Sequence, residues 1–267
     1  VSRHLPSALR YTIFVMDGSS LNPLIMRRYF ILISFLLLVI FPASRVQATI
    51  PDSVCYVYYL DVGQGAATLL SFPCGAILID AGGQSNTHID AMIGELEAFF
   101  DERPELDRSF ASVMITHDHP DHTKGLDEVL ENFTVERLIY NGKAEGSRSE
   151  LREAVEQAGS LGVEVLAVSF EMITEGGNFL GYTDENIDPL DCPGIDPEIR
   201  ILSGGFESNP GWPHREFDND NNHSLVVRVD YGESSFFFSG DLEEDAIETL
   251  VDHYRGTNML DADVYQV

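Results

Sequence analysis

The chain has 267 residues, of which 16 are lysine or arginine and 44 are aspartate or glutamate, for a formal net charge of −28 at pH 7. An apolar fraction of 44% is typical of a packed globular core and excludes an intrinsically disordered chain. A surface this acidic argues against a general DNA-coating protein, though not against an enzyme whose bound cations create a local positive site.

The N-terminal part has the pattern of a secretory signal peptide. A short basic segment precedes an apolar run of 13 residues at 29–41, and a small-x-small ending follows at Ala48. The run is shorter than the roughly 20 residues of a membrane span, although an uncleaved anchor helix is the alternative. We therefore expect residues 1–25 to be a non-native upstream extension, 26–48 a signal peptide and 49–267 the mature domain.

These boundaries predict a secreted or periplasmic protein with no stable membrane association after the signal is cleaved. Residues 1–48 contain five arginines and one aspartate, so the mature chain keeps 11 basic and 43 acidic residues, a formal charge of −32. Long-range repulsion of phosphate polyanions is therefore stronger in the mature protein than in the whole chain.

The predicted elements of the mature chain alternate between strands and helices. In chain order, the patterns predict strands at 54–61, 67–72 and 76–80, a helix at 88–100, a strand at 110–116, a helix at 126–133, a strand at 135–140, a helix at 149–161, strands at 163–168, 224–231 and 235–239, and a helix at 242–254. This alternation indicates one layered α/β domain.

Residues 174–222 break the pattern, because glycine, proline, aspartate and asparagine predominate there. One short strand, at 199–202, is predicted within the stretch. An irregular segment of this length is either a functional loop or a disordered insert.

The three cysteines allow a disulfide. Cys55 and Cys74 lie at similar distances on either side of the turn at 63–65, so the two predicted strands bring them nearly opposite each other. A Cys55–Cys74 disulfide is therefore the candidate, with two buried free thiols as the alternative. Cys192 has no evident partner and lacks the spacing of a zinc site.

The segment ITHDHPDH, residues 115–122, concentrates metal ligands behind an apolar strand. His117 and His119 are two residues apart, so they project to the same side of an extended backbone. Asp121 and His122 follow where the chain turns into a helix, and their side chains can face the same centre. Imidazoles together with a carboxylate suit zinc, and also manganese or iron.

This H-x-H-x-D-H pattern resembles the metallo-β-lactamase fold, an αββα sandwich that usually carries two metal ions. Four further motifs narrow the resemblance: DVGQG (61–65), LIDAGG (78–83), NNHSLVV (221–227) and FFFSGD (236–241). Together they are similar to the hydrolase domain of ComEC-type competence proteins and their secreted stand-alone relatives, over nearly all of 54–267.

The resemblance implies a ligand set for two divalent ions, zinc or manganese. His117 and His119 would bind the first ion, Asp121 and His122 the second, and Asp241 would bridge them. Asp80 would orient the ligands through hydrogen bonds.

The resemblance leaves the third ligand of the first ion open. The family places either a histidine or an asparagine-rich segment before the strand that begins at Ser224. We expect His223 to be this ligand, with Asn222 as the second candidate and His214 as a more distant third.

Two departures from the family pattern bear on activity. Ala66 stands where the family commonly has an acidic residue after GQG. In the relatives, a segment similar to ADVYQV leads into a histidine-containing turn that supplies another ligand, whereas here Val267 ends the sequence and no histidine follows His253. We therefore expect a C-terminally truncated domain whose second metal site lacks one ligand.

The resemblance implies a hydrolase in which two metal ions activate a shared water, with Asp121 or Asp241 moving the proton. The motifs favour a phosphodiesterase or nuclease connected with DNA uptake or degradation, with single-stranded DNA as a candidate substrate. Trp212 and Phe217 would then stack on bases, unless they simply pack within their loop. The alternatives are an esterase or lactonase of the same fold, and a non-catalytic metal-binding accessory module.

Overall fold

The computed structural model describes residues 12–17, 53–144 and 149–266. The expected signal peptide at 26–48 lies outside the described residues, as does most of the expected upstream extension. The described part of that extension is strand β1 (Thr12–Asp17), which pairs antiparallel with β2 (Val54–Tyr59). No helix within the described ranges is long and apolar enough to cross a membrane.

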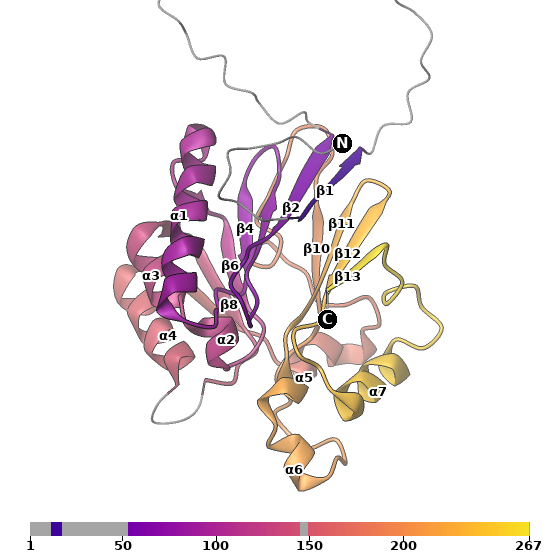
Figure 1. Ribbon diagram of the computed structural model, residues 1–267. Helices are drawn as coiled ribbons and strands as arrows, with labels where there is room; N and C mark the ends of the chain where they lie inside the picture. Colours follow the sequence, from indigo (N-terminus) through magenta and orange to yellow (C-terminus); the bar gives the residue numbers. More distant parts are fainter. Residues whose placement is uncertain (1–11, 18–52, 145–148, 267) are drawn as a thin grey trace, which may run out of the picture.

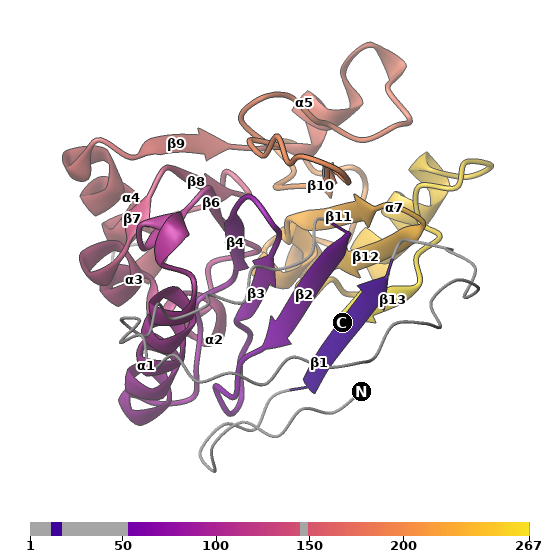
Figure 2. The same cartoon turned by 90° about the horizontal axis from the view of Figure 1, so that it is seen from above.

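Two sheets lie face to face between two layers of helices (Figures 1 and 2). The first sheet has the order β1-β2-β3-β4-β6-β8-β9, and the second has the order β10-β11-β12-β13. The remaining strands of the first sheet are β3 (Thr68–Ser71), β4 (Ala76–Ile79), β6 (Ser112–Ile115), β8 (Arg137–Tyr140) and β9 (Glu164–Ala167). The second sheet consists of β10 (Glu198–Ser203), β11 (Val226–Tyr231), β12 (Ser234–Phe238) and β13 (Val264–Gln266).

Helices cover the outer face of each sheet (Figure 2). The first sheet is covered by α1 (Asn86–Glu102), α3 (Leu126–Asn132) and α4 (Glu150–Leu161). The second is covered by α7 (Glu244–His253). Shorter elements are β5 (Ser109–Phe110), β7 (Thr134–Val135), α2 (Pro120–Thr123), α5 (Phe170–Thr174), α6 (His214–Phe217), η1 (Pro104–Leu106), η2 (Glu175–Gly177) and η3 (Asp220–His223).

Each central strand is apolar on both faces because it lies between two cores. In β4, Leu78 packs against the helices while Ile77 and Ile79 pack between the sheets. In β12, Phe236 faces the first sheet and Phe237 packs with the core beside α7. Side chains of successive strand residues point to opposite faces, so uninterrupted apolar runs are what a four-layer sandwich requires.

The αββα fold predicted from the sequence is confirmed, with two differences in detail. The predicted strand at 110–116 is divided at Ala111, whose amide donates to the Ala76 carbonyl while β5 pairs with β7 instead of the main sheet. The irregular stretch at 174–222 contains strand β10 and several turns, and Tyr182 exchanges two backbone hydrogen bonds with Ile201.

The predicted Cys55–Cys74 disulfide is wrong, because Cys74 is bonded to Cys192 and Cys55 is a buried free thiol. The pairing register of β2 with β3 places Tyr56 opposite Ser71, so Cys55 lies beside Phe72 rather than Cys74. Cys55 points into the core between the sheets. Cys74 lies in the β3–β4 turn and reaches the long loop before β10.

Candidate metal centre

Several of the predicted ligands meet at the end of the sandwich where β4 and β6 of the first sheet finish. Asp80 follows β4 and Thr116 follows β6, and parallel neighbours end at the same edge of a sheet. One hydrogen bond joins the second sheet to this edge, because the amide of Leu225 donates to the Thr116 carbonyl at 2.7 Å. On the side of the second sheet, the amide of Asp241 donates to Ser224 Oγ at 3.3 Å.

Asp80 organises the buried side of the site. Its carboxylate accepts from the Thr116 amide at 2.8 Å, from the Thr116 hydroxyl, and from His122 Nδ1 at 2.8 Å. Its backbone has a φ of 59°, a left-handed conformation that is costly for a residue other than glycine. The surrounding hydrogen bonds hold this conformation and aim the carboxylate at His122.

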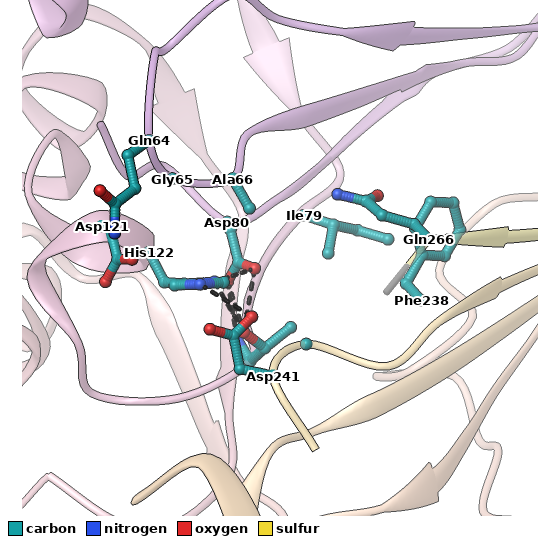
Figure 3. Close-up of a pocket in the computed structure, with 12 residues that line it drawn as sticks. Gln64, Gly65, Ala66, Ile79, Asp80, Asp121, His122, Phe238, Asp241 and Gln266 are labelled. Carbon is teal, nitrogen blue, oxygen red and sulfur yellow. Dashed lines mark hydrogen bonds and ion pairs between the residues drawn. The ribbon is translucent and has the colours of Figure 1, made fainter. Parts of the chain in front are cut away.

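His117, His122 and Asp241 form the central donor cluster. Their ligand atoms all lie within 4.8 Å of one another. His122 lies between two carboxylates, with Nδ1 on Asp80 and Nε2 at 3.3 Å from Asp241 (Figure 3). His119 adjoins the cluster, because its Nδ1 is 3.1 Å from His117 Nε2.

The surroundings of the cluster shift the pKa values of its two buried imidazoles in opposite directions. Burial disfavours the charged form of His122, but Asp80 and Asp241 outweigh this effect and raise the pKa to about 10. Burial, together with the neighbouring His122 and His119, lowers the pKa of His117 to about 3. The hydrogen bond from His122 lowers the pKa of Asp241, so this carboxyl group is ionised at neutral pH.

The donor set fits a divalent cation. Nε2 of His117 and Nδ1 of His119 face each other, and these two imidazoles would hold a divalent ion through their ring nitrogens. Asp80 holds Nδ1 of His122, which leaves Nε2 for the cluster and fixes the ring orientation that a ligand needs. Imidazole nitrogens with carboxylate oxygens suit zinc and also manganese.

Asp121 lines the cavity beside this cluster, and a hydrogen bond to its backbone carbonyl holds it there. The cavity has a volume of about 260 Å³, and Figure 3 shows Asp121 and Gln64 on the opposite side of it from Ile79. The Asp121 carbonyl accepts from the Ala66 amide at 2.9 Å. A Cβ atom at Gly82 would lie 1.7 Å from this carbonyl oxygen, so the close approach requires a glycine.

The structure does not bring His223 into the cluster, in contrast to our prediction. Nδ1 of His223 accepts from the Phe206 amide at 3.0 Å, and Nε2 donates to the Phe217 carbonyl at 2.7 Å. Burial lowers the pKa of this imidazole, which keeps it neutral. Both ring nitrogens therefore stabilise the loop before β11, and neither faces His117.

The two other candidates for this ligand are also engaged elsewhere. The side chain of Asn222 donates to the Glu216 carbonyl at 3.0 Å and accepts from the Glu243 amide at 3.2 Å. His214 is exposed on α6 and forms an ion pair with Asp218 at 2.6 Å. In this structure, the histidines at the centre are thus those of the segment 115–122.

Trp212 packs within its own loop. Its ring lies 4.6 Å from that of Phe206 in an edge-on arrangement, and its Nε1 donates to Thr249 Oγ1 at 3.0 Å. Phe217 lies 5.1 Å from the His223 ring and is partly exposed. Trp212 is also partly exposed, so both aromatic residues proposed to stack on bases pack against neighbouring rings and keep part of their surface accessible.

Sequence reasoning missed two polar residues that support the site. The sequence pattern predicts Thr116 as the end of a strand, and in the structure its hydroxyl contacts both oxygens of Asp80. Asn141, buried directly after β8, donates to the His223 carbonyl at 2.9 Å and accepts from the Lys143 amide at 3.0 Å. A polar residue at the carboxyl end of an apolar strand is the signal that could have identified both.

The fold and the histidine cluster agree with the family assignment of the chain. A model of the metallo-β-lactamase superfamily matches residues 60–266, and the chain belongs to this superfamily. Members are metal-dependent hydrolases that typically bind divalent metal ions, often zinc, and the chain is a hydrolase of this class. No curated protein sequence matches it significantly.

Solved structures of the same fold resemble the chain only distantly. The metallo-β-lactamase fold protein YhfI from Bacillus subtilis is 11% identical, with a TM-score of 0.35, and the match covers 69% of this chain and 61% of that protein. A HARLDQ-motif metallo-β-lactamase from Cronobacter sakazakii is 12% identical, with a TM-score of 0.41 and coverages of 78% and 76%. A diphosphatase of the PhnP family is 12% identical, with a TM-score of 0.29 and coverages of 70% and 56%.

Proposed function

We propose that this chain is a secreted, metal-dependent phosphodiesterase related to the hydrolase domains of ComEC-type competence proteins. The observation that carries the proposal is the line of side chains from Asp80 through His122 to Asp241, beside His117 and His119. The line begins on a buried carboxylate and ends at a partly exposed one that faces the cavity.

Each residue of the line has a role in hydrolysis. Asp80 fixes the tautomer and orientation of His122, and His122 keeps Asp241 ionised. An ionised Asp241 at the cavity wall can accept a proton from an attacking water. Divalent ions held by the histidines and Asp241 would lower the pKa of a bound water toward neutrality. They would also stabilise charge on the phosphoryl oxygens.

The sequence supports a phosphodiester substrate, and the charge of the chain favours a small one. The motifs DVGQG, LIDAGG and FFFSGD resemble those of ComEC-type proteins. A formal charge of −32 on residues 49–267, which contain 11 basic and 43 acidic residues, repels long duplexes. A cavity of about 260 Å³ holds the groups around one scissile bond rather than a large ligand.

The experiment compares substrates with the protein loaded with zinc or manganese. We expect hydrolysis of bis(p-nitrophenyl) phosphate and of single-stranded oligonucleotides, with activity lost on chelation. His119→Ala should abolish it, whereas His214→Ala should not, because His214 lies on the exposed face of α6.

The other outcomes identify the rival functions. Hydrolysis of p-nitrophenyl acetate or a lactone without hydrolysis of either phosphodiester would identify an esterase. Tight binding of a single metal ion with no turnover of any of these substrates would support a non-catalytic accessory module.

We also propose that the protein functions outside the cytoplasm. The disulfide between Cys74 and Cys192 supports this location, since disulfides persist in oxidising compartments. N-terminal sequencing of protein recovered from the periplasm or medium should find Thr49 as the first residue. Recovery of an uncleaved chain in the cytosol would contradict the proposal.

A further inference from the structure

Positive charge is scarce in this chain, which has 16 lysine and arginine residues against 44 aspartate and glutamate residues. The sequence contains two lysines, Lys124 and Lys143. Seven of the arginines in the described ranges form ion pairs with carboxylates. Within the part of the chain that the structure describes, three lysine or arginine side chains have no carboxylate oxygen within 4.0 Å. They are Lys124, Lys143 and Arg215.

Lys143 is held in place by a buried asparagine. The side-chain oxygen of Asn141 accepts from the Lys143 amide at 3.0 Å, and its amide group donates to the His223 carbonyl at 2.9 Å. The Asn141 carbonyl accepts from the Gly205 amide at 2.8 Å. These bonds fix the start of the loop after β8 against the segment that follows β10 and the segment that precedes β11.

A series of contacts connects the side chain of Lys143 with the metal centre. Its Nζ lies 5.8 Å from the centroid of the Phe217 ring. That ring contacts His223, the last residue of η3. Asp220, the first residue of η3, is 3.9 Å from Nε2 of His119. A single short helix therefore links the lysine to a predicted metal ligand.

We propose that Lys143, beside the partly exposed ring of Phe217, binds a phosphate group adjacent to the scissile phosphodiester. This inference rests on the proposed function. A phosphate binds more favourably to an ammonium group that has no ion-pair partner than to a paired one, because no existing pair has to be broken. In a chain of such negative charge, a local cation beside Phe217 attracts anionic groups that the rest of the surface repels.

The single tryptophan of the chain provides a direct measure of binding. Trp212 lies 6.3 Å from the Phe217 ring, so its fluorescence responds to a ligand at this position. Thymidine 5′-monophosphate and thymidine are a matched pair of probes that differ by one phosphate. Wild type, Lys143→Ala and Lys124→Ala are titrated at equal, measured metal content. Lys124→Ala is the control, since this lysine lies near Glu150.

We expect Lys143→Ala to weaken binding of thymidine 5′-monophosphate about tenfold, the loss typical of one charge-assisted hydrogen bond. Binding of thymidine should change less than twofold, and Lys124→Ala should bind both probes as wild type does. Equal affinity of wild type and Lys143→Ala for the nucleotide would overturn the proposal. Equal weakening by both variants would also overturn it, because it would indicate a general charge effect.

Turnover separates this inference from the proposed function. The dinucleotides TpT and pTpT share one scissile bond, but pTpT carries an additional phosphate. In Lys143→Ala, KM for pTpT should rise about tenfold with little change in kcat, and both constants for TpT should remain as in wild type. If neither dinucleotide is cleaved, the phosphodiesterase proposal fails, while the fluorescence titration still decides whether Lys143 binds phosphate.

Discussion

At the scale of single residues, the hydrogen bonds of Asp80 and His122 matter more than the number of ligands in the motif. Asp80 is 2% exposed, adopts a left-handed backbone and accepts three kinds of donor. His122 depends on this carboxylate for its orientation, and Asp241 depends on His122 for its lowered pKa. A change at one member of this chain of contacts should therefore alter the others.

Asp80→Asn should lower zinc affinity by about 10- to 100-fold, the loss typical when a hydrogen-bond partner of a metal ligand is removed. The amide of the variant cannot replace the charged acceptor that orients His122. Competition with a zinc chelator of known affinity measures the effect. Asp90→Asn, an exposed change on α1, is the control, and equal affinities for the two variants would show that Asp80 does not support the ligand.

Asp188 lies in the loop before β10, and its raised pKa makes the free energy of unfolding depend on pH. Burial raises its pKa to about 6, with Asp196 and Glu198 adding to the effect, and its Oδ1 has no hydrogen-bond partner. The ordinary value for the unfolded chain is 3.8. The folded state thus binds more protons between these pH values, and this group makes folding less favourable as pH rises from about 4 to 6.

Asp188→Asn should therefore stabilise the protein at pH 7.5 by about 1 kcal/mol, after allowance for the solvent that screens this half-exposed carboxylate. The gain should shrink as the pH falls toward 5. Urea unfolding at several pH values measures it, with Asp191→Asn in the same loop as the control for a lost exposed charge. A gain that is independent of pH would show that ionisation of Asp188 is not its cause.

At the scale of elements, the glycine turns position the histidine motif. The turn after β4 passes so close to the segment 121–122 that a Cβ atom at Gly82 would lie 1.7 Å from the Asp121 carbonyl oxygen and 2.3 Å from the His122 nitrogen. Gly65 has a φ of 141° and also faces the Asp121 carbonyl. The two glycine motifs are thus needed for backbone packing on the metal-binding segment.

Gly82→Ala should destabilise the fold by about 1–3 kcal/mol, the usual cost of overpacking, and should also weaken metal binding by moving the 121–122 peptide. Gly94→Ala on α1 is the matched control, because its Cβ would contact nothing within 4 Å and alanine favours a helix by about 0.5–1 kcal/mol. Denaturant unfolding should give opposite signs for the two variants. Destabilisation by both would mean that the close contact at Gly82 is not responsible.

At the scale of the whole molecule, the Cys74–Cys192 disulfide joins the β3–β4 turn of the first sheet to the loop that leads into β10. The bond spans 118 residues, so it restricts the unfolded chain strongly. Cys55 remains in the core between the sheets, and burial raises the pKa of its thiol to about 12. A thiol so protonated and buried is a poor nucleophile.

Replacing both Cys74 and Cys192 with serine should lower the free energy of unfolding by about 2–4 kcal/mol.

In the unchanged protein, a thiol reagent should label no cysteine under native conditions, and it should label one cysteine in denaturant. Peptide mapping of the labelled protein should place that thiol at Cys55. A label on Cys192 would instead support the pairing that we first predicted from the sequence.

The sequence by itself determined the layered fold and most of the centre. The alternation of strands and helices predicted a layered α/β domain, and the resemblance carried by the H-x-H-x-D-H motif predicted the αββα sandwich. His117, His119 and His122 are close in the chain, so their proximity was predictable from the motif, and the structure places His117 against both of the others. Asp80 and Asp241 were predicted from the resemblance, and the structure places both against His122.

The tertiary structure decided which distant groups meet. Cys192 is separated from Cys74 by 118 residues, and only the path of the long loop brings them together. The sequence around His223 is compatible with a ligand, but the carbonyl of Phe217 and the amide of Phe206 occupy its two nitrogens. The role of Lys143 likewise depends on Asn141 joining two segments of the chain. Such choices depend on packing between elements, which local patterns do not encode.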